Sequence, residues 1–461
     1  MALASESRHG MWSSRWLFVM AAAGSAVGIG NIWKFPYIAG ENGGGAFVLI
    51  YLVCVAFIGI PIMMSEVMMG RAGRASPINT MRTLRDRAKA HRAWVMVGWM
   101  GVLAGFLILS YYAVIAGWAM NYIWLTASGT FDGGTAAQAS ATFDSFLESP
   151  LELIFWQTLF MILTVWIVGR GVTKGLETAI RIFMPMLFLL LIVLLVYSVN
   201  SGGFAAGFAF MFDVDKSAFT NPTIWLTAMG QAFFTLSLGM GTMMAYGAYV
   251  PEKAGIGGMV VTIALLDTTV AVSAGLAIFP IVFANGLDAA QGPGLLFVTV
   301  PLAFGQLPLG ALFGTLFFLL VSFAALTSAI SLTEPALAYL VEEYNAKRKR
   351  VAISLGVICW LLGLGTVFSF NVLADFHLVG SLTIFESADF LSEKILLPLG
   401  GLLIAVFAAW KIPNDILQTQ LNIKTAFGKF MWRLVAGLVA PLGVMTVFVY
   451  TLKPYVEGWF S

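Results

Sequence analysis

Charged residues, cysteines and histidines are all scarce in this 461-residue chain. Charged side chains make up 10% of it, against about 25% in soluble globular proteins, which excludes a water-exposed surface of the ordinary kind. The 25 basic residues nearly balance the 23 acidic ones, which excludes the strongly basic surface of a nucleic-acid-binding protein. The two cysteines, Cys54 and Cys359, cannot form a disulfide framework.

Sequence motifs of enzymes and ATP-driven pumps are also missing. The three histidines have no metal-ligand spacing, and the chain has no Walker A loop, nucleophile elbow or Cys/His cluster. We therefore expect neither an ATP-driven pump nor an enzyme. We expect no organic cofactor, and no obligatory protein partner is evident.

Apolar sequence is what the chain has in abundance. Hydrophobic residues make up 59% of it, with 14 Trp, 37 Phe and 48 Gly, which fits a chain solvated by the lipid bilayer. About 20 apolar residues span a bilayer as an α-helix. Eleven such runs predict an all-α polytopic membrane protein with 11 transmembrane helices, forming a single transmembrane domain over residues 1–461. The runs lie at about 13–37, 44–70, 94–125, 152–169, 174–199, 222–250, 256–284, 308–340, 351–370, 389–410 and 430–452.

Positive charge predicts how the chain crosses the membrane. With the N-terminus in the cytoplasm and alternating spans, most of the 25 basic residues fall in cytoplasmic segments, as the positive-inside rule requires. The C-terminus then lies outside. The first run follows Arg8 and Arg15 and could be read as a signal peptide. Its apolar character resumes beyond Asn31 and ten further runs follow, so we interpret it as a retained span.

Two of the runs contain glycine clusters that disfavour a continuous helix. Residues 24–31 read GSAVGIGN and residues 237–242 read SLGMGT, and a glycine costs about 1 kcal/mol relative to alanine in a helix interior. Glycines in membrane helices also serve close packing, but Asn31 and Gln231 place polar groups beside both clusters. We therefore predict that helices 1 and 6 are broken.

The two clustered runs occupy matching places in the chain. Each opens a set of five spans, about 13–199 and about 222–410, and one extra helix follows at about 430–452. An odd number of spans per set turns the second set upside down, which predicts a 5+5 inverted repeat. Broken helices at matching places in inverted repeats indicate a transporter's binding site. Exposed carbonyls there can bind a cation, and half-helix N-termini can bind an anion.

Several ionisable and hydroxyl groups lie inside the spans. A charged side chain at mid-depth costs at least about 2.5–3.5 kcal/mol. We interpret Glu66 and Glu334 as carboxylates that cap neighbouring helices, and Asp267 as linked to a cation or a shared proton. Thr327 and Ser328 can bond back to their own helix or, with carbonyls from the first span, bind a monovalent cation.

Long motifs then identify a family resemblance. They are AGSAVGIGNIWKFP at 23–36, ENGGGAF at 41–47, GIP at 59–61, GR at 70–71, and QAFFTLSLGMG at 231–241, together with Trp12, Glu66, Tyr111 and Tyr112. Over the first ten spans the chain resembles the neurotransmitter:sodium symporter family, in its prokaryotic amino-acid branch with the leucine-transporter fold. The resemblance implies a bacterial inner-membrane protein that moves an amino acid together with sodium ions.

The resemblance also implies the residues of two sodium sites and a substrate pocket. The first sodium site would use Ala26, Asn31, Thr235, Asp267 and the substrate carboxylate, and the second would use Gly24, Val27, Ala324, Thr327 and Ser328. The substrate carboxylate would meet Tyr112 and Gly30, and its ammonium would meet Ala26, Phe234, Thr235 and Ser237. The side-chain pocket would be lined by Ile108, Tyr112, Phe234, Met240, Ser328 and Leu332.

Three positions shape the expected specificity. Gly28 stands where amine-transporting relatives have Asp, which favours an amino acid that keeps its carboxylate. Asp267 replaces a neutral Asn of the chloride-dependent branch, so chloride is not expected. Met240 is a flexible thioether between two glycines and favours bulky aliphatic or aromatic side chains.

The resemblance pairs gate residues on each side of the membrane. Lys34 would pair with Asp389 on the outer side, and Arg8 with Glu342 on the inner side, where Arg8 could equally be a topology charge. Trp12 and Tyr249 would lie near the inner pair.

The resulting hypothesis is sodium-coupled, chloride-independent symport of a hydrophobic L-amino acid into the cell by alternating access. A proton-coupled permease of the same fold, with Asp267 as the proton carrier, is one alternative. A membrane sensor or channel that binds an amino acid without accumulating it is another.

Overall fold

The computed structural model describes residues 9–287 and 294–460, with side-chain surroundings as far as residue 453. Regular structure in this part of the chain is helical, apart from an isolated bridge between Val379 and Leu382. This confirms the all-α prediction. The longer helices are α1 (Arg15–Ala26), α3 (Gly45–Cys54), α4 (Ile60–Gly73), α6 (Val95–Ala127), α8 (Pro150–Val168), α9 (Thr178–Val199), α11 (Pro222–Thr235), α13 (Ile256–Ala284), α15 (Gly310–Tyr344), α16 (Arg348–Phe368), α18 (Leu397–Trp410) and α21 (Ala440–Phe460).

Shorter helices connect or extend these. They are α2 (Phe35–Glu41), α5 (Pro77–Arg87), α7 (Ala136–Leu147), α10 (Phe204–Phe212), α12 (Thr242–Gly247), α14 (Val300–Gly305), α17 (Ile384–Asp389), α19 (Asn414–Leu421) and α20 (Ala426–Leu434). Wider π-helical turns join several pairs, at Gly30–Lys34, Val55–Gly59, Val172–Glu177, Leu295–Thr299, Phe390–Leu396 and Val435–Val439.

Within the described residues, nine helical segments are long and apolar enough to cross a membrane, and a bent pair brings the number to ten. The bent pair joins Arg15–Ala26 to Gly30–Glu41 at 54°. The expected eleven spans also included residues 222–250. There the structure has α11 and α12 with a six-residue gap, and neither piece alone is long enough to span. Along the second half of α9, exposed side chains such as Leu189, Ile192 and Val196 are apolar, as on a lipid-facing surface.

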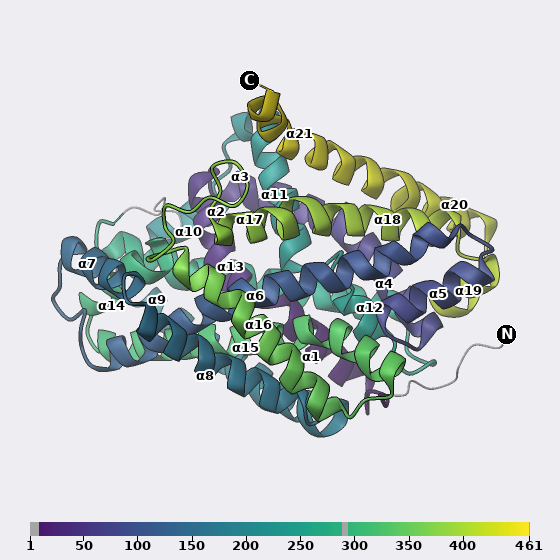
Figure 1. Cartoon of the computed structure of the whole chain (residues 1–461). Coiled ribbons are helices and arrows are strands. Elements are labelled where there is room, and N and C mark those ends of the chain that lie inside the picture. The colour runs from purple at the N-terminus through teal and green to yellow at the C-terminus, as the bar shows by residue number, and fades with distance from the viewer. Residues whose placement is uncertain (1–8, 288–293, 461) are drawn as a thin grey trace.

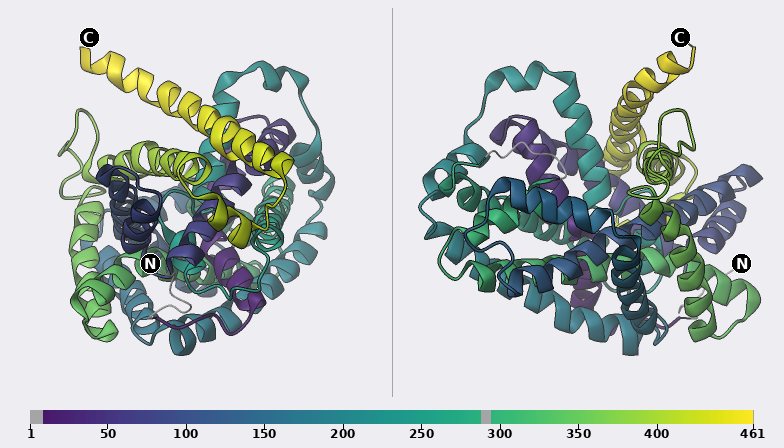
Figure 2. Two further views of the ribbon diagram at one scale, coloured as in Figure 1. Left: turned by 90° about the vertical axis from the view of Figure 1, so that its right-hand side faces the viewer. Right: turned by 60° about the vertical axis from the view of Figure 1, so that its left-hand side comes forward.

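The helices pack as a bundle around the broken first helix (Figure 1). The long α15 runs along α6, and α6 also contacts α8 and α16. Helix α1 lies between α13 and α15, and α12 packs on α4. Helix α21 crosses the outside of α18, and its yellow ribbon projects from one side of the molecule in both views of Figure 2. The breaks in the chain are therefore enclosed by continuous helices.

The break after α1 confirms the predicted interruption of the first helix. Helix α1 ends at Ala26, and Val27 is extended at φ −73° and ψ 96°. Close packing contributes as well, because a Cβ added at Gly28 would lie 2.6 Å from Ser328 Oγ and one at Gly30 would lie 2.6 Å from Phe234 Cε1. The glycines of this cluster therefore have both expected roles: they lie at the break in the helix, and they leave room for neighbouring side chains to pack closely.

The break between α11 and α12 has left-handed backbone at Ser237, Gly239 and Gly241, with φ of 53°, 79° and 73°. Glycine adopts this region without strain. The fully buried Glu66 carboxylate accepts the Gly239 amide at 2.7 Å, so it bonds to the backbone of the break itself, and its expected role as a helix cap stays a prediction. Ser237 Oγ donates to the Ser25 carbonyl at 3.0 Å, so the two breaks touch.

Candidate functional site

A small cavity of about 30 Å³ lies where the two breaks meet, between α6 and α15. The residues around it come from four parts of the chain that are far apart in sequence. They are Ser25, Ala26, Gly28, Gly30, Ile108, Tyr112, Phe234, Ser237, Met240, Ser328 and Leu332. The structure therefore brings the expected substrate-pocket residues together, except that Thr235 lies outside this lining and Ser25 is added to it.

The cavity has a polar end and an apolar end. At the polar end, the Ile29 amide donates to the Tyr112 hydroxyl at 3.2 Å and Ser328 Oγ donates to the Ser25 carbonyl at 3.1 Å. Ile108, Met240 and Leu332 provide the apolar surface. Free amides and hydroxyls at the start of a helix can bind a carboxylate, and the apolar end can accept a hydrophobic side chain.

Asp267 forms a separate polar cluster beside the first break. Its carboxylate accepts Asn31 Nδ2 at 2.7 Å, Thr235 Oγ1 at 3.0 Å and the Tyr51 hydroxyl at 3.2 Å. The Asn31 amide oxygen in turn accepts the Gly28 amide at 3.2 Å. Asp267 is fully buried, and among the described residues no basic side chain pairs with it. A buried carboxylate without a positive partner requires a bound cation or a proton.

Tyr51 was not found by sequence reasoning. It is a fully buried tyrosine of α3. Its neighbours in the sequence are apolar, so the sequence does not distinguish it from a residue that only packs in the core. Its phenolic hydroxyl adds a neutral donor to the Asp267 carboxylate. Such a donor stabilises the ionised carboxylate and supplies no charge of its own.

The second expected ion site gathers hydroxyls of α15 beside the end of α1. Ser328 Oγ lies 3.5 Å from the Gly24 carbonyl, and a Cβ added at Gly24 would lie 3.4 Å from Thr327 Cβ. Thr327 Oγ1 donates to the Ala324 carbonyl at 2.9 Å, which is the helix back-bond considered from the sequence. Val27, the fifth expected member, caps the end of α1. The oxygens that could bind a monovalent cation are thus close together, with their hydroxyls currently bonded to carbonyls.

Beyond the first break lies a group that we call the Lys34 closure, defined by Lys34, Asp389 and Glu393. The family resemblance pairs Lys34 with Asp389, but in the structure the ammonium bonds to Glu393, about one helical turn further along. The lysine also lies 4.3 Å above the Phe234 ring. Both carboxylates line a cavity of about 380 Å³ that shares Gly30, Tyr112 and Phe234 with the small cavity. The pairing was missed because Asp389 and Glu393 lie on the same helical face.

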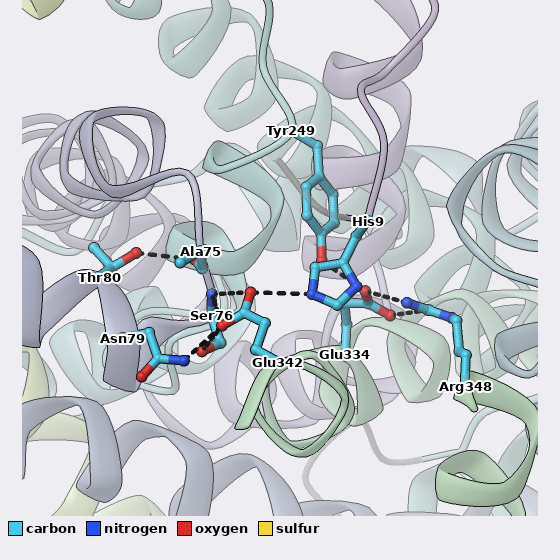
Figure 3. Close-up of polar contacts among 9 residues, drawn as sticks. All are labelled: His9, Ala75, Ser76, Asn79, Thr80, Tyr249, Glu334, Glu342 and Arg348. Atoms are coloured by element: carbon cyan, nitrogen blue, oxygen red, sulfur yellow. Dashed lines mark hydrogen bonds and ion pairs between the residues drawn. The ribbon is translucent and has the colours of Figure 1, made fainter. Parts of the chain in front are cut away.

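Before α1 lies a second group, the N-terminal closure, defined by Trp12, Tyr249, Glu334, Glu342 and Arg348. Trp12 donates its indole to the Tyr246 carbonyl at 3.1 Å and its amide to the Tyr249 carbonyl at 2.9 Å. The Tyr249 hydroxyl donates to Glu334 at 2.8 Å, and both guanidinium nitrogens of Arg348 contact the same carboxylate (Figure 3). Glu334 therefore forms an ion pair, and its expected role as a helix cap is wrong.

Glu342 collects donors from two other segments, as Figure 3 shows. It accepts His9 Nε2 at 3.0 Å, Ser76 Oγ at 2.6 Å and Asn79 Nδ2 at 2.8 Å. Its expected partner Arg8 lies outside the described residues. The sequence does not single out His9 or Arg348, because each lies beside other basic residues and only the fold brings it to a carboxylate.

Comparison with known proteins agrees with this geometry. The model of the sodium:neurotransmitter symporter family matches residues 9–142 and 143–460. The sodium-dependent transporter YhdH of Bacillus subtilis is 41% identical over 448 residues, covering 96% of this chain and 98% of the relative. A sodium-dependent transporter of Haemophilus influenzae is 33% identical over 448 residues, with the same coverage of both chains.

A solved structure is similar along almost the whole chain. The crystal structure of MhsT in complex with L-phenylalanine matches with a TM-score of 0.87 and 44% identity, covering 95% of this chain and 99% of that one. This likeness confirms the expected leucine-transporter fold. The chain therefore belongs to the sodium:neurotransmitter symporter family, as a sodium-dependent multi-pass membrane transporter and not an enzyme.

Proposed function

We propose that this transporter carries a hydrophobic L-amino acid, aliphatic or aromatic, into the cell together with two sodium ions and without chloride. One observation carries the proposal. The buried Asp267 carboxylate, with no positive partner among the described residues, bonds to Asn31 and Thr235 beside the broken-helix cavity. A cation held there can share its coordination with the carboxylate of a bound amino acid, so each ligand strengthens the binding of the other.

The cavity suggests how the amino acid is held. Its carboxylate would meet the Gly30 amide and the Tyr112 hydroxyl, and its ammonium would meet the carbonyls at the two breaks. The side chain would lie against Ile108, Met240 and Leu332. MhsT, whose structure contains L-phenylalanine, supports a bulky apolar side chain. At about 30 Å³ the cavity has room for about two or three water molecules, so binding requires Phe234 or Met240 to move.

Two ions would provide the driving force. Asp267, Asn31, Thr235 and the Ala26 carbonyl would hold the first, and the hydroxyls and carbonyls gathered at the end of α1 the second. Moving two sodium ions down a potential of about 100 mV and a tenfold gradient releases about 7 kcal/mol. Such a release supports accumulation of up to about 10⁵-fold. The fixed negative charge of Asp267 can offset the positive charge of the bound sodium ions, as a chloride ion would. We therefore propose chloride independence.

Topology completes the proposal. We propose eleven spans, with α11 and α12 as the two halves of the sixth, in two inverted repeats at about 13–199 and 222–410 and an extra helix at about 430–452. The whole chain, 1–461, then forms one domain in a bacterial cell membrane. The N-terminal closure faces the cytoplasm and the Lys34 closure faces outside. Opening of one closure while the other stays shut gives alternating access.

Uptake into proteoliposomes tests this function. We expect saturable accumulation of labelled phenylalanine or leucine above the external concentration when sodium is outside, no accumulation when potassium replaces it, and no change when gluconate replaces chloride. Undiminished uptake without sodium but with a proton gradient would establish the proton-coupled alternative. Saturable binding without accumulation would establish a sensor or channel.

A further inference from the structure

A groove of about 610 Å³ lies between α8 and α16 and shares no lining residue with the broken-helix cavity. The two helices pack side by side at the front of the molecule in Figure 1. Gly356 allows them to approach closely, because a Cβ there would lie 2.2 Å from Val165 Cγ2. Where the helix backbones meet, the side chains on either side form the walls of a groove.

The groove walls are apolar and exposed. On α8, Ile162 and Trp166 are 59% and 55% exposed, and on α16, Ile353 and Val357 are 47% and 51% exposed. Both helices are candidate membrane spans. Hydrocarbon therefore surrounds this surface, and a groove in such a surface is filled by an acyl chain rather than by water.

Two cations close one end of the groove. Arg170 follows the end of α8, and Lys349 is the second residue of α16. The two backbones are adjacent, since a Cβ at Gly169 would lie 3.8 Å from the Lys349 Cα. The Arg170 guanidinium lies 3.7 Å above the Trp166 ring, which holds it at the groove. In the described part of the chain, neither cation has a carboxylate partner, whereas the neighbouring Arg348 turns inward to Glu334.

We propose that this groove binds one anionic phospholipid, with an acyl chain between α8 and α16 and its phosphate between Arg170 and Lys349. Arginine binds phosphate through paired hydrogen bonds, and basic residues at the cytoplasmic membrane surface attract anionic headgroups. This site is independent of the proposed substrate and ions.

The position of the groove connects it to the N-terminal closure. Arg170 lies two residues before the π-helical turn Val172–Glu177, and Glu177 accepts the Ser13 amide at 2.7 Å just before α1. On the other wall, Lys349 follows Arg348, which holds Glu334. A phosphate bound by both cations would stabilise the two segments that support this closure.

Lipid binding to the purified full chain tests the proposal. We would remove lipid in detergent, add phosphatidylglycerol or phosphatidylcholine with identical acyl chains, and measure bound lipid by native mass spectrometry and stability by thermal unfolding. The expected result is one retained phosphatidylglycerol per chain, bound about tenfold more tightly than phosphatidylcholine and accompanied by a higher unfolding temperature. The double variant Arg170→Gln/Lys349→Gln should lose the preference.

A matched control exists elsewhere on the chain. Arg433 lies 5.8 Å from the Trp410 ring, and Lys411 follows that tryptophan, but none of the three lines the groove between α8 and α16. Lys411→Gln/Arg433→Gln should keep the lipid preference. Ile353→Trp, which fills the groove and leaves its charges, should abolish retention.

Three results would overturn the proposal. Equal binding of the two lipids by the unmodified chain would exclude a site selective for anionic lipid. Equal loss of the phosphatidylglycerol preference in both double variants would show that the preference comes from general surface charge. Cross-linking of two chains through cysteines placed at Ile162 and Val357 would show that a second copy, rather than lipid, occupies the groove.

Discussion

The two ends of the broken first helix are closed in different ways. At the N-terminal closure, Glu334 is fully buried and pairs with Arg348, while Trp12 bonds to two backbone carbonyls. At the Lys34 closure, a lysine side chain that is 21% exposed pairs with Glu393 beside a cavity of about 380 Å³. The Arg348 and Glu334 side chains are 15% and 0% exposed, against 21% and 9% for Lys34 and Glu393. Removing one partner of a buried pair costs about 3–5 kcal/mol, and this cost falls as water reaches the pair, to about 0–1 kcal/mol for a fully exposed one. The Lys34 side should therefore open more readily.

Loss of Arg348 should produce the largest change. Arg348→Gln leaves the Glu334 carboxylate buried without its partner, which favours opening of the N-terminal closure. With both native cysteines replaced by alanine, we expect an impermeant thiol reagent to label a cysteine at Ser25 from the cytoplasmic side at least about a hundredfold faster, since 1.4 kcal/mol is a factor of ten.

The exposed neighbour Arg350 supplies the control for this change. Arg350→Gln removes the same charge from an exposed side chain that does not pair with Glu334, so labelling should stay at the rate of the unmodified chain. Equal acceleration in both variants would contradict the assigned role of the Arg348–Glu334 pair.

Loss of Lys34 should produce a smaller change on the opposite side. Lys34→Gln removes a partly exposed ion pair, so we expect labelling of the same cysteine from outside to rise by about fivefold. A rise of a hundredfold, equal to that of Arg348→Gln, would show that the two closures are equally strong.

Lys34→Arg should strengthen the weaker closure. Arginine has several donors in a planar fork, and Asp389 and Glu393 both line the cavity beside this side chain. We expect outside labelling to slow by about threefold. Faster labelling than in the unmodified chain would show that the longer side chain does not reach the second carboxylate.

The smallest effect should come from His9. Glu342 keeps its bonds to Ser76 and Asn79 when His9→Gln is made, and one hydrogen bond contributes about 0.5–1.5 kcal/mol. Cytoplasmic labelling should rise by about twofold. An effect as large as that of Arg348→Gln would mean that His9 is a main support of the closure.

Local backbone chemistry could be predicted from the sequence. Glycine clusters beside polar residues located both breaks. A family resemblance located Asn31, Thr235 and Asp267, and in the structure Asn31 and Thr235 both donate to the Asp267 carboxylate. A carboxylate inside an apolar span indicated that Glu66 bonds to backbone amides, and it accepts the Gly239 amide.

Partner choice between distant helices could not be predicted in the same way. Asp389 and Glu393 are both plausible partners for Lys34 by spacing, and only the packing of the helices selects between them. Arg348 sits among other basic residues and is distinguished only by turning inward to Glu334. The Tyr51 hydroxyl of α3 bonds to Asp267 of α13, and no polar residue next to Tyr51 in the sequence indicates this contact.

Sodium-dependent phenylalanine binding to the purified chain in chloride-free buffer tests the central claim most directly. We predict saturable binding that requires sodium in the unmodified chain, and a loss of at least about a hundredfold in Asp267→Asn that added chloride partly restores. Asp389→Asn, outside the small cavity, should bind as the unmodified chain does. Unchanged sodium-dependent binding by Asp267→Asn without chloride would contradict the account.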